Sequence, residues 1–266
     1  MLATPEALRA RLRAAWARNA RDWLHGGGNW PLTCSTHPPT QAQAVANWPA
    51  FDAWLRQWRE SPGAGEVERQ TRDWPLLGAQ TIPVRWRFSA PADVADALGE
   101  GRRWRVARAR YDALVAQYAF CTALSRAVSR QFDLLADLPD AEFARLNDVL
   151  RWLHAHPDSG LYLRQLPIAG VHSKWIEPYR GVLAAWLATL RGADSTDGLY
   201  AVAGLRPMPD RIRLRVLDAT LRARLGGVGD IEAPLEQLAA LSLPVRCAFI
   251  VENLATGLAF GDLPGA

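Results

Sequence analysis

The sequence predicts an α+β protein whose amino-terminal part is mostly helical. Apolar residues recur at helical spacing over 5–24 and 143–156, as they do along one face of an α-helix. Apolar and polar residues alternate over 82–88 and 211–218, which is typical of a half-buried strand. Near the carboxyl end, the apolar run 247–251 has the composition of a strand that is covered on both faces.

The predicted amino-terminal helices are rich in tryptophan, of which the chain has 12. Trp16 and Trp23 lie at helical spacing in the first helix, and Trp54 and Trp58 do so in the second, over 50–60. Exposed aromatic rings can stack on unpaired bases. Rings at helical spacing more often fill a core, and we predict that role for these tryptophans.

Five arginines lie between Arg102 and Arg110, in a further predicted helix. Arginine binds phosphate bidentately, so this stripe is either a phosphate-facing surface or a solvated helix face balanced by nearby acids. The second interpretation is the more common one and is favoured here. Lys174 is the only lysine among 31 basic residues, and the net charge of +4 permits nucleic-acid binding without requiring it.

The order of elements over 143–191 is that of a helix-turn-helix. Helix 143–156 is followed by a short helix near 161–166, a tight turn and a long helix from 173 to 191. In such a module the last helix enters the major groove of DNA. The candidate DNA-binding residues at its start are His172, Ser173, Lys174 and Arg180. The alternative is a set of packed helices whose polar faces meet only water.

Glu252, directly after the apolar run 247–251, is the candidate catalytic and metal-binding residue. A strand that ends in an acid can deliver an oxygen ligand to a hard divalent ion, but such a site needs further carboxylates. The residues that follow supply only Asp262, in a predicted loop. The alternative role for Glu252 is a strand cap or an ion pair with Arg246.

Composition sets the remaining limits. The chain has 266 residues, 49% of them hydrophobic and 22% charged, which is ordinary for a soluble globular protein of two or three domains. No apolar run approaches the ~18 residues that a membrane span needs. Cys34, Cys121 and Cys247 are scattered and form neither a metal site nor a disulfide framework, which indicates a reducing cytoplasm.

Several stretches carry a family resemblance. "RQLPIAGVHSKWIE" (164–177) and "FIVEN" (249–253) are the most specific, and "IRLRVLD" (212–218) and "LGAQTIPVRW" (77–86) accompany them. Together they resemble the JetD nuclease subunit of Wadjet bacterial plasmid-defence systems, over nearly the whole chain.

The resemblance implies an arm domain over 1–138, a winged-helix (CAP-like) DNA-binding domain over 139–205 and the start of a Toprim domain over 206–266. It also implies a homodimer that cuts double-stranded plasmid DNA and uses Mg²⁺ as its cofactor. The implied partners are condensin-like motor subunits, and no membrane is involved. Toprim chemistry uses a strand-end glutamate and a later Asp-x-Asp. Glu252 matches the glutamate, and 253–266 contain no Asp-x-Asp.

We therefore expect this chain to be truncated within the Toprim domain. It would be the DNA-binding portion of a Wadjet-type nuclease, inactive or incomplete by itself, and whether it is an enzyme stays open. The rival interpretation is a non-catalytic interaction protein that docks a partner through its helices and does not bind nucleic acid.

Overall fold

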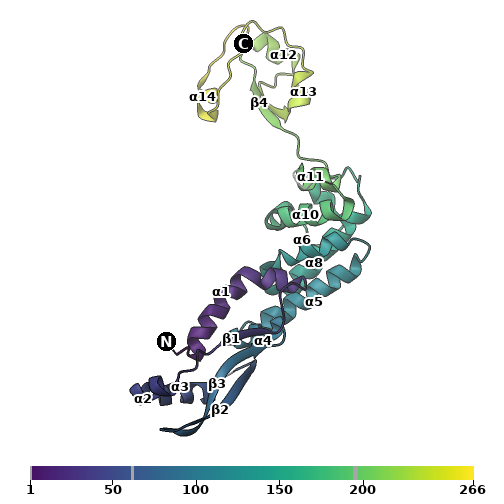
Figure 1. The fold of residues 1–266 in the computed structure, drawn as a ribbon. Coiled ribbons are helices and arrows are strands. Elements are labelled where there is room, and N and C mark those ends of the chain that lie inside the picture. Colours follow the sequence, from purple (N-terminus) through teal and green to yellow (C-terminus); the bar gives the residue numbers. More distant parts are fainter. Residues whose placement is uncertain (1, 61–62, 194–196) are drawn as a thin grey trace. The chain divides into compact units, whose positions relative to one another are not determined.

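A computed structural model describes residues 2–60, 63–193 and 197–266 (Figure 1). The chain divides into two compact units, residues 1–205 and 206–266, which are described separately. The first unit contains α1 (Pro5–Leu24), β1 (Leu32–Ser35), α2 (Gln41–Ala46), α3 (Trp48–Glu60), β2 (Glu66–Trp74), β3 (Gly78–Phe88), α4 (Pro91–Leu98), α5 (Gly101–Gln117), α6 (Thr122–Ser129), α7 (Phe132–Asp137), α8 (Asp140–Ala155), η1 (Leu163–Gln165), α9 (Ser173–Ile176), η2 (Glu177–Tyr179), α10 (Arg180–Arg191) and α11 (Gly198–Ala203). The second contains β4 (Arg211–Arg215), α12 (Ala219–Arg224), β5 (Asp230–Pro234), α13 (Leu235–Ala239) and α14 (Leu254–Ala259). None of the described helices is both long enough and apolar enough to cross a membrane.

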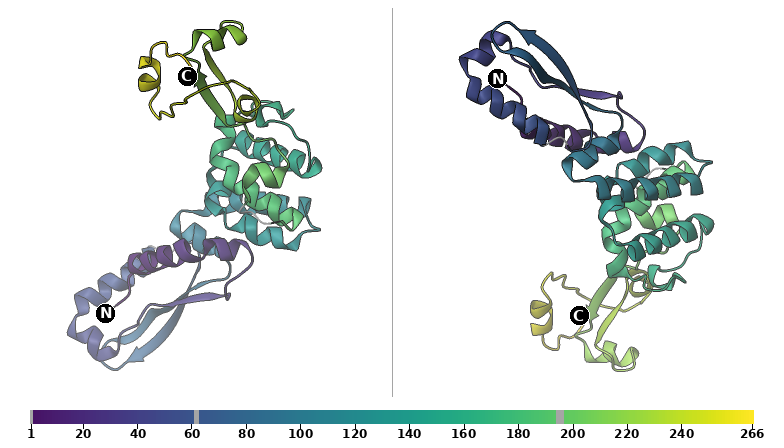
Figure 2. Two further views of the ribbon diagram at one scale, coloured as in Figure 1. Left: turned by 90° about the horizontal axis from the view of Figure 1, so that it is seen from above. Right: turned by 90° about the horizontal axis from the view of Figure 1, so that it is seen from below.

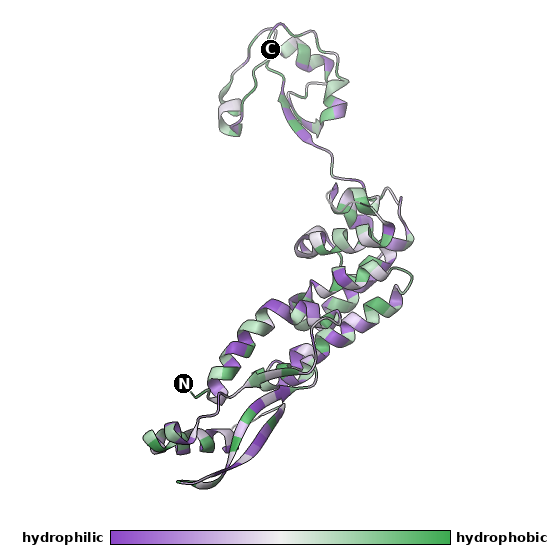
Figure 3. Ribbon diagram, viewed as in Figure 1, coloured by the Kyte–Doolittle hydropathy of each residue, from purple (hydrophilic) through white to green (hydrophobic). Residues whose placement is uncertain are grey.

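The sheet of the first unit has three antiparallel strands in the order β1-β3-β2. Ile82, Trp86 and Phe88 of β3 are fully buried, and Figure 3 shows both hydrophilic and hydrophobic residues along the β2–β3 hairpin. Helices α1 and α3 lie along one face of the sheet (Figure 2). There the Trp58 ring meets the Trp86 ring edge-on, with 5.6 Å between centroids. The strand predicted over 82–88 is confirmed.

The tryptophans confirm the prediction of a core role. Eight of the twelve are buried within the described residues: Trp16, Trp23, Trp54, Trp58, Trp74, Trp86, Trp104 and Trp186. Several rings meet edge-on, the arrangement that the charge distribution of aromatic rings favours. Trp16, for example, contacts Trp23, Trp104 and Phe132 in this way.

The core of the first unit continues across residue 138, where the sequence places a domain boundary. Trp186 of α10 donates its indole N–H to the carbonyl of Ala127, at 3.3 Å. The Cys121 thiol lies 3.4 Å from the carbonyl oxygen of Thr189. The helices on the two sides of residue 138 therefore pack as one unit, and their separation into two domains stays a prediction.

The long helix predicted over 173–191 is interrupted. α9 ends at Ile176, the 3-10 turn η2 holds Pro178, and α10 begins at Arg180. Proline has no backbone N–H and its ring clashes with the preceding turn, so a regular α-helix does not run through it. The described residues between 139 and 205 form helices and no β-strand, so the wing of a winged helix is not among them.

In the second unit, β4 and β5 pair antiparallel, from Arg211 opposite Pro234 to Arg215 opposite Asp230. The strand predicted over 211–218 is confirmed for its first five residues. The strand predicted over 247–251 is wrong, because this segment is irregular and no described strand pairs with it.

The exposure of this segment explains the error. A strand forms where a neighbouring backbone accepts and donates its hydrogen bonds, and among the described strands of this unit β4 and β5 bond to each other. The side chain of Ile250 is 99% exposed, and those of Phe249 and Val251 are 53% and 42% exposed. The apolar composition of 247–251 predicted that these side chains would be buried, but no described residues cover them.

Candidate nucleic-acid interface and the Glu252 segment

Three of the four predicted DNA-binding residues lie together at the start of α9. The Nδ1 atom of His172 accepts the backbone N–H of Trp175 at 3.2 Å, so His172 is the N-cap of α9. Serine is more often found at that position, and Ser173 lies one residue further along the chain. His172 takes it because its backbone is extended (φ −146°, ψ 168°), as an N-cap requires.

Each of the three presents a different donor. With Nδ1 accepting a hydrogen bond, the neutral His172 ring carries its proton on Nε2. The Ser173 hydroxyl accepts the Nε–H of Arg164 at 3.4 Å. Lys174 is exposed, and its ammonium makes no hydrogen bond or ion pair with the residues that the structure describes. Lys174 is thus the cation of this turn that is free to meet an anion.

Arg164 is a member of this group that sequence reasoning missed. It is exposed on the 3-10 turn η1, and the hydrogen bond to Ser173 brings its guanidinium to the start of α9. The available signal was that Arg164 is the only basic residue in the connection 161–171. We name Arg164, His172, Ser173 and Lys174 the donor turn.

Arg180, the fourth predicted residue, has contacts of its own. Its guanidinium pairs with Glu177 at 2.8 Å and lies over the ring of Tyr200, 5.0 Å from the centroid. Neither contact is shared with the donor turn. Arg180 lies beyond the break at Pro178, and it is half-buried against groups that already satisfy its charge.

The arginine stripe of α5 is balanced by acids, as the favoured interpretation predicted. Arg103 pairs with Glu100, Asp133 and Asp137, at 2.9, 3.0 and 2.6 Å. The remaining ion pairs of the stripe are Arg105–Asp96, Arg108–Asp112 and Arg110–Asp140. These carboxylates neutralise most of the stripe, so it is the weaker candidate for phosphate contact.

In the second unit, Glu252 is exposed at the edge of a cavity of about 610 Å³ between β4 and the irregular segment 241–253. The alternative role of Glu252, an ion pair with Arg246, does not occur among the described residues. Arg246 instead donates to the carbonyl of Pro264, at 3.2 Å. Among the described residues, no group of three or more His, Cys, Asp or Glu side chains could hold a metal ion.

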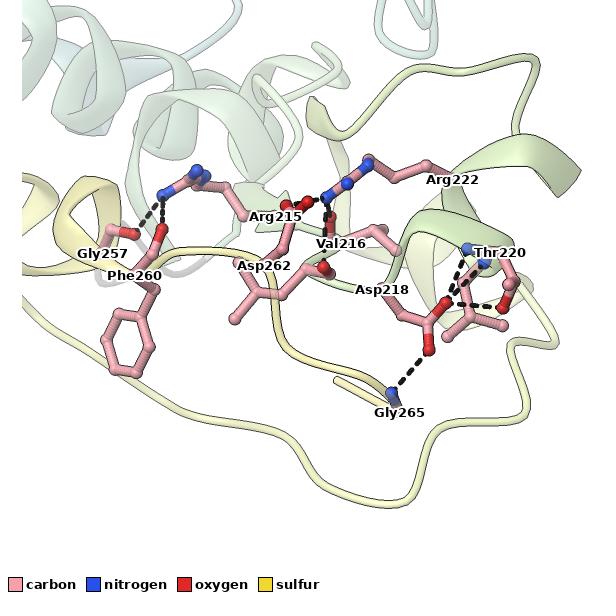
Figure 4. A network of polar contacts seen from close by, with 11 residues as sticks. Arg215, Val216, Asp218, Thr220, Arg222, Gly257, Phe260, Asp262 and Gly265 are labelled. Carbon is pink, nitrogen blue, oxygen red and sulfur yellow. Dashed lines mark hydrogen bonds and ion pairs between the residues drawn. The ribbon is translucent and has the colours of Figure 1, made fainter.

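The acid that follows Glu252 in the sequence, Asp262, is already paired. Arg222 contacts its carboxylate at 2.8 Å (Figure 4), and this hydrogen bond and charge hold the pKa of Asp262 below its ordinary value. A carboxylate paired in this way is less available as a metal ligand, because binding an ion would break the pair.

Asp218 is the centre of the same polar network (Figure 4). Its carboxylate accepts the N–H groups of Thr220 and Leu221 at 2.7 and 3.1 Å, which caps α12, and the N–H of Gly265 at 2.6 Å. These bonds, the one from the Thr220 hydroxyl above all, hold the pKa of Asp218 well below its usual range. Asp218 therefore acts as a structural anchor.

Arg215 provides a second anchor. Its guanidinium donates to the carbonyls of Gly257 and Phe260, at 2.6 and 3.3 Å (Figure 4). Arg246 and Cys247 donate their backbone N–H groups to the carbonyl of Gly265. The segment that carries Glu252 is thus held at both ends, while its middle projects into solvent.

Fold and site together define an α+β protein with a cation-bearing turn in a helical unit and a small second unit in which Glu252 is exposed beside a cavity. Residues 5–188 match the family described as "Uncharacterized protein conserved in bacteria N-term (DUF3322)", and residues 204–266 match the family "Wadjet protein JetD, C-terminal". The chain belongs to the JetD family of Wadjet proteins. No curated protein matches it. The second family match begins close to residue 206, where the second unit begins.

Proposed function

We propose that this chain binds duplex DNA through the donor turn, as part of a Wadjet system that acts on plasmid DNA. The observation that carries the proposal is the exposed Lys174 ammonium, which has no partner among the described residues and lies between two further donors. Membership of the JetD family supports the Wadjet role.

The donors suit the DNA backbone. A lysine ammonium binds phosphate as a point charge, and the planar guanidinium of Arg164 can bind two phosphate oxygens at once. The Nε2–H of His172 and the hydroxyl of Ser173 add neutral donors of the kind that position a protein on the backbone. Such contacts release counterions, so the affinity falls steeply with salt and depends little on sequence.

Magnesium-dependent phosphodiester cleavage is the reaction that we propose for the second unit, with Glu252 as a metal ligand or acid-base group. The described residues do not fit a complete magnesium site, because Asp262 and Asp218 are engaged and Glu252 offers one carboxylate. Cleavage therefore needs acidic ligands in addition to these. The winged-helix and Toprim assignments, the homodimer and the condensin-like partners belong to this proposal and rest on the family resemblance.

The DNA-binding proposal is tested by charge reversal. We expect the double variant Arg164→Glu with Lys174→Glu, both in the donor turn, to bind duplex DNA more weakly than the original chain and with a shallower dependence on salt, measured by fluorescence anisotropy between 50 and 200 mM salt. The matched control reverses two exposed cations that are ion-paired elsewhere in the first unit, Arg13→Glu with Arg56→Glu. Equal affinity of the double variant and the original chain would refute the proposal.

Cleavage has its own test. The purified 266-residue chain is expected to bind a supercoiled plasmid in the presence of Mg²⁺ and to leave it intact, because no group of three or more acidic, His or Cys side chains among the described residues could hold the ion. Robust cleavage that Glu252→Gln abolishes would show that the described acids suffice and would overturn the account of an incomplete site.

A second candidate function, the docking of a partner protein, is favoured by the exposed apolar side chains of Phe249, Ile250 and Val251. Apolar groups of this size in contact with water mark interaction sites. The partners proposed are other Wadjet subunits. The cytoplasm is the proposed compartment, since Cys34, Cys121 and Cys247 are all free thiols.

A further inference from the structure

The donor turn is fastened to α8 by a cluster of three side chains. The indole Nε1–H of Trp175 donates to the Glu142 carboxylate. Arg145 pairs with the other oxygen of Glu142 at 2.7 Å, and its guanidinium lies over the Trp175 ring, 5.4 Å from the centroid. We name Glu142, Arg145 and Trp175 the α8–α9 lock.

The connection that leads to α9 also passes over this lock. Gly170 has φ +77°, a conformation that favours glycine. A Cβ atom there would lie 3.0 Å from the guanidinium carbon of Arg145, closer than side-chain contacts normally are. Arg145, which belongs to α8, therefore contacts both the connection at Gly170 and Trp175 of α9. Glycine at position 170 leaves space for the Arg145 guanidinium.

α9 needs such external support. It has four residues, and helices this short do not hold their conformation in water without tertiary contacts. Its N-cap bond, from Trp175 to His172, joins the lock to the donor turn through a single residue. A hydrogen bond to a carboxylate is stronger than one between neutral groups, and the Glu142 and Arg145 side chains are only 30% and 29% exposed.

From this geometry we infer that the α8–α9 lock is a positioning device for the proposed DNA contact. Glu142, Arg145 and Trp175 bind no phosphate themselves. They fix the orientation of α9, so that Lys174 and His172 face the DNA backbone together. The inference rests on the proposed DNA binding. It means that Glu142, Arg145 and Trp175 raise the affinity for DNA indirectly, by positioning Lys174 and His172.

A double-mutant cycle on the full 266-residue chain tests the inference, with duplex DNA as the probe. Lys174→Gln removes one phosphate contact, so the slope of log K against log salt is expected to fall in magnitude by about 0.9. Trp175→Phe keeps the ring and deletes the Nε1–H donor, and the same decrease is expected. The two changes together are expected to lower the slope no further than either does alone, because each removes the same contact.

Three matched variants separate positioning from a general loss of stability. Glu142→Gln retains an acceptor for the Trp175 indole and is expected to keep the slope of the original chain, whereas Glu142→Ala removes the acceptor and is expected to show the same decrease as Trp175→Phe. Trp152→Phe changes a half-buried tryptophan of the same helix α8 that lies outside the lock, and it is expected to change nothing. If Trp175→Phe does not fold, the two Glu142 variants give the same comparison.

The outcomes distinguish the inference from the proposal beneath it. An unchanged slope for Lys174→Gln would refute DNA binding by the donor turn. A reduced slope for Lys174→Gln with full slopes for Trp175→Phe and Glu142→Ala would leave DNA binding intact and refute the lock. Strictly additive effects of Lys174→Gln and Trp175→Phe would also refute it, since they would show that Trp175 acts apart from Lys174.

Discussion

The carboxylate of Asp218 accepts the backbone N–H of Gly265 at 2.6 Å, so one side chain both caps α12 and holds the segment 263–266. The backbone N–H groups of Leu217 and Asp218 also bind this segment, since they donate to the carbonyl of Ala266 at 3.0 and 2.9 Å. The folded structure of the second unit thus depends on the Asp218 carboxylate, which accepts several hydrogen bonds and is kept ionised by them.

We predict that the second unit loses stability in acid through Asp218. Its pKa is lowered below the ordinary value of 3.8 by the bonds that it accepts. As the pH falls, the unfolded chain therefore takes up the proton first, so this contribution is full above about pH 5 and is lost progressively below about pH 4.

Urea unfolding of the second unit at several pH values measures the effect. Asp218→Asn is expected to lower the stability at pH 7 and to flatten its dependence on pH below 5. The control is Asp210→Asn, at an exposed carboxylate that accepts no hydrogen bond from the described residues. Equal pH profiles for Asp218→Asn and the original chain would contradict the assignment of Asp218 as an anchor.

Two glycines at helix ends predict very different responses to alanine. Gly192 ends α10 at φ +64°, and Gly204 ends α11 at φ +62°. A Cβ atom at Gly192 meets nothing within 4 Å, whereas one at Gly204 would lie 1.8 Å from the carbonyl oxygen of Pro157. Gly192→Ala is expected to cost about 1 kcal/mol for the left-handed backbone alone.

Gly204→Ala is expected to cost about 1–3 kcal/mol more than Gly192→Ala, because the backbone at Pro157 must also move. Guanidinium chloride unfolding of the two variants measures the difference directly. Since the backbone angles match, the comparison isolates the steric contact. If both variants lost the same free energy of unfolding, the backbone around Pro157 would have to move away from a Cβ atom at position 204 at little energetic cost, and the prediction would be wrong.

The elements that could be predicted from the sequence are those whose pattern is local. The helix over 5–24 and the strand over 82–88 each repeat apolar residues with the period of their own backbone, and both occur as expected. The segment 247–251 shows the limit of this reasoning. Its composition is that of a strand, but a strand also needs a partner, which composition does not reveal.

The candidate site divides in the same way. Lys174 was predictable because it follows the turn of a recognisable helical module. Arg164 was not, because its place beside Ser173 depends on how the connection 161–171 folds. The sequence offered Arg180 as an equal donor, although Glu177 and Tyr200 engage it. Contacts across a turn decide which cations are free, and they depend on tertiary structure.

The Trp58–Trp86 contact predicts where the first unit is most sensitive to mutation. Both rings are at most 1% exposed, and they meet between α3 and β3. Trp86→Ala is expected to lower the free energy of unfolding by about 3–5 kcal/mol, because the cavity cannot be filled by neighbouring side chains. Trp48→Ala, at a ring that is 42% exposed, is expected to cost about 1 kcal/mol. Chemical denaturation followed by tryptophan fluorescence measures both, and similar losses would contradict the assigned core.

Ile250 gives the opposite expectation. Its side chain is 99% exposed, so replacement by a charged residue removes no buried contact. Ile250→Lys is expected to leave the melting temperature unchanged within about 1 °C and to reduce self-association, because an exposed apolar run promotes aggregation. Light scattering over a range of protein concentrations, together with thermal melting, measures both.

Leu221→Lys, at a buried residue of α12, is the contrasting variant and is expected to unfold the second unit. A marked loss of melting temperature for Ile250→Lys would show that the segment 247–251 is buried in solution, either within its own unit or against another copy of the chain.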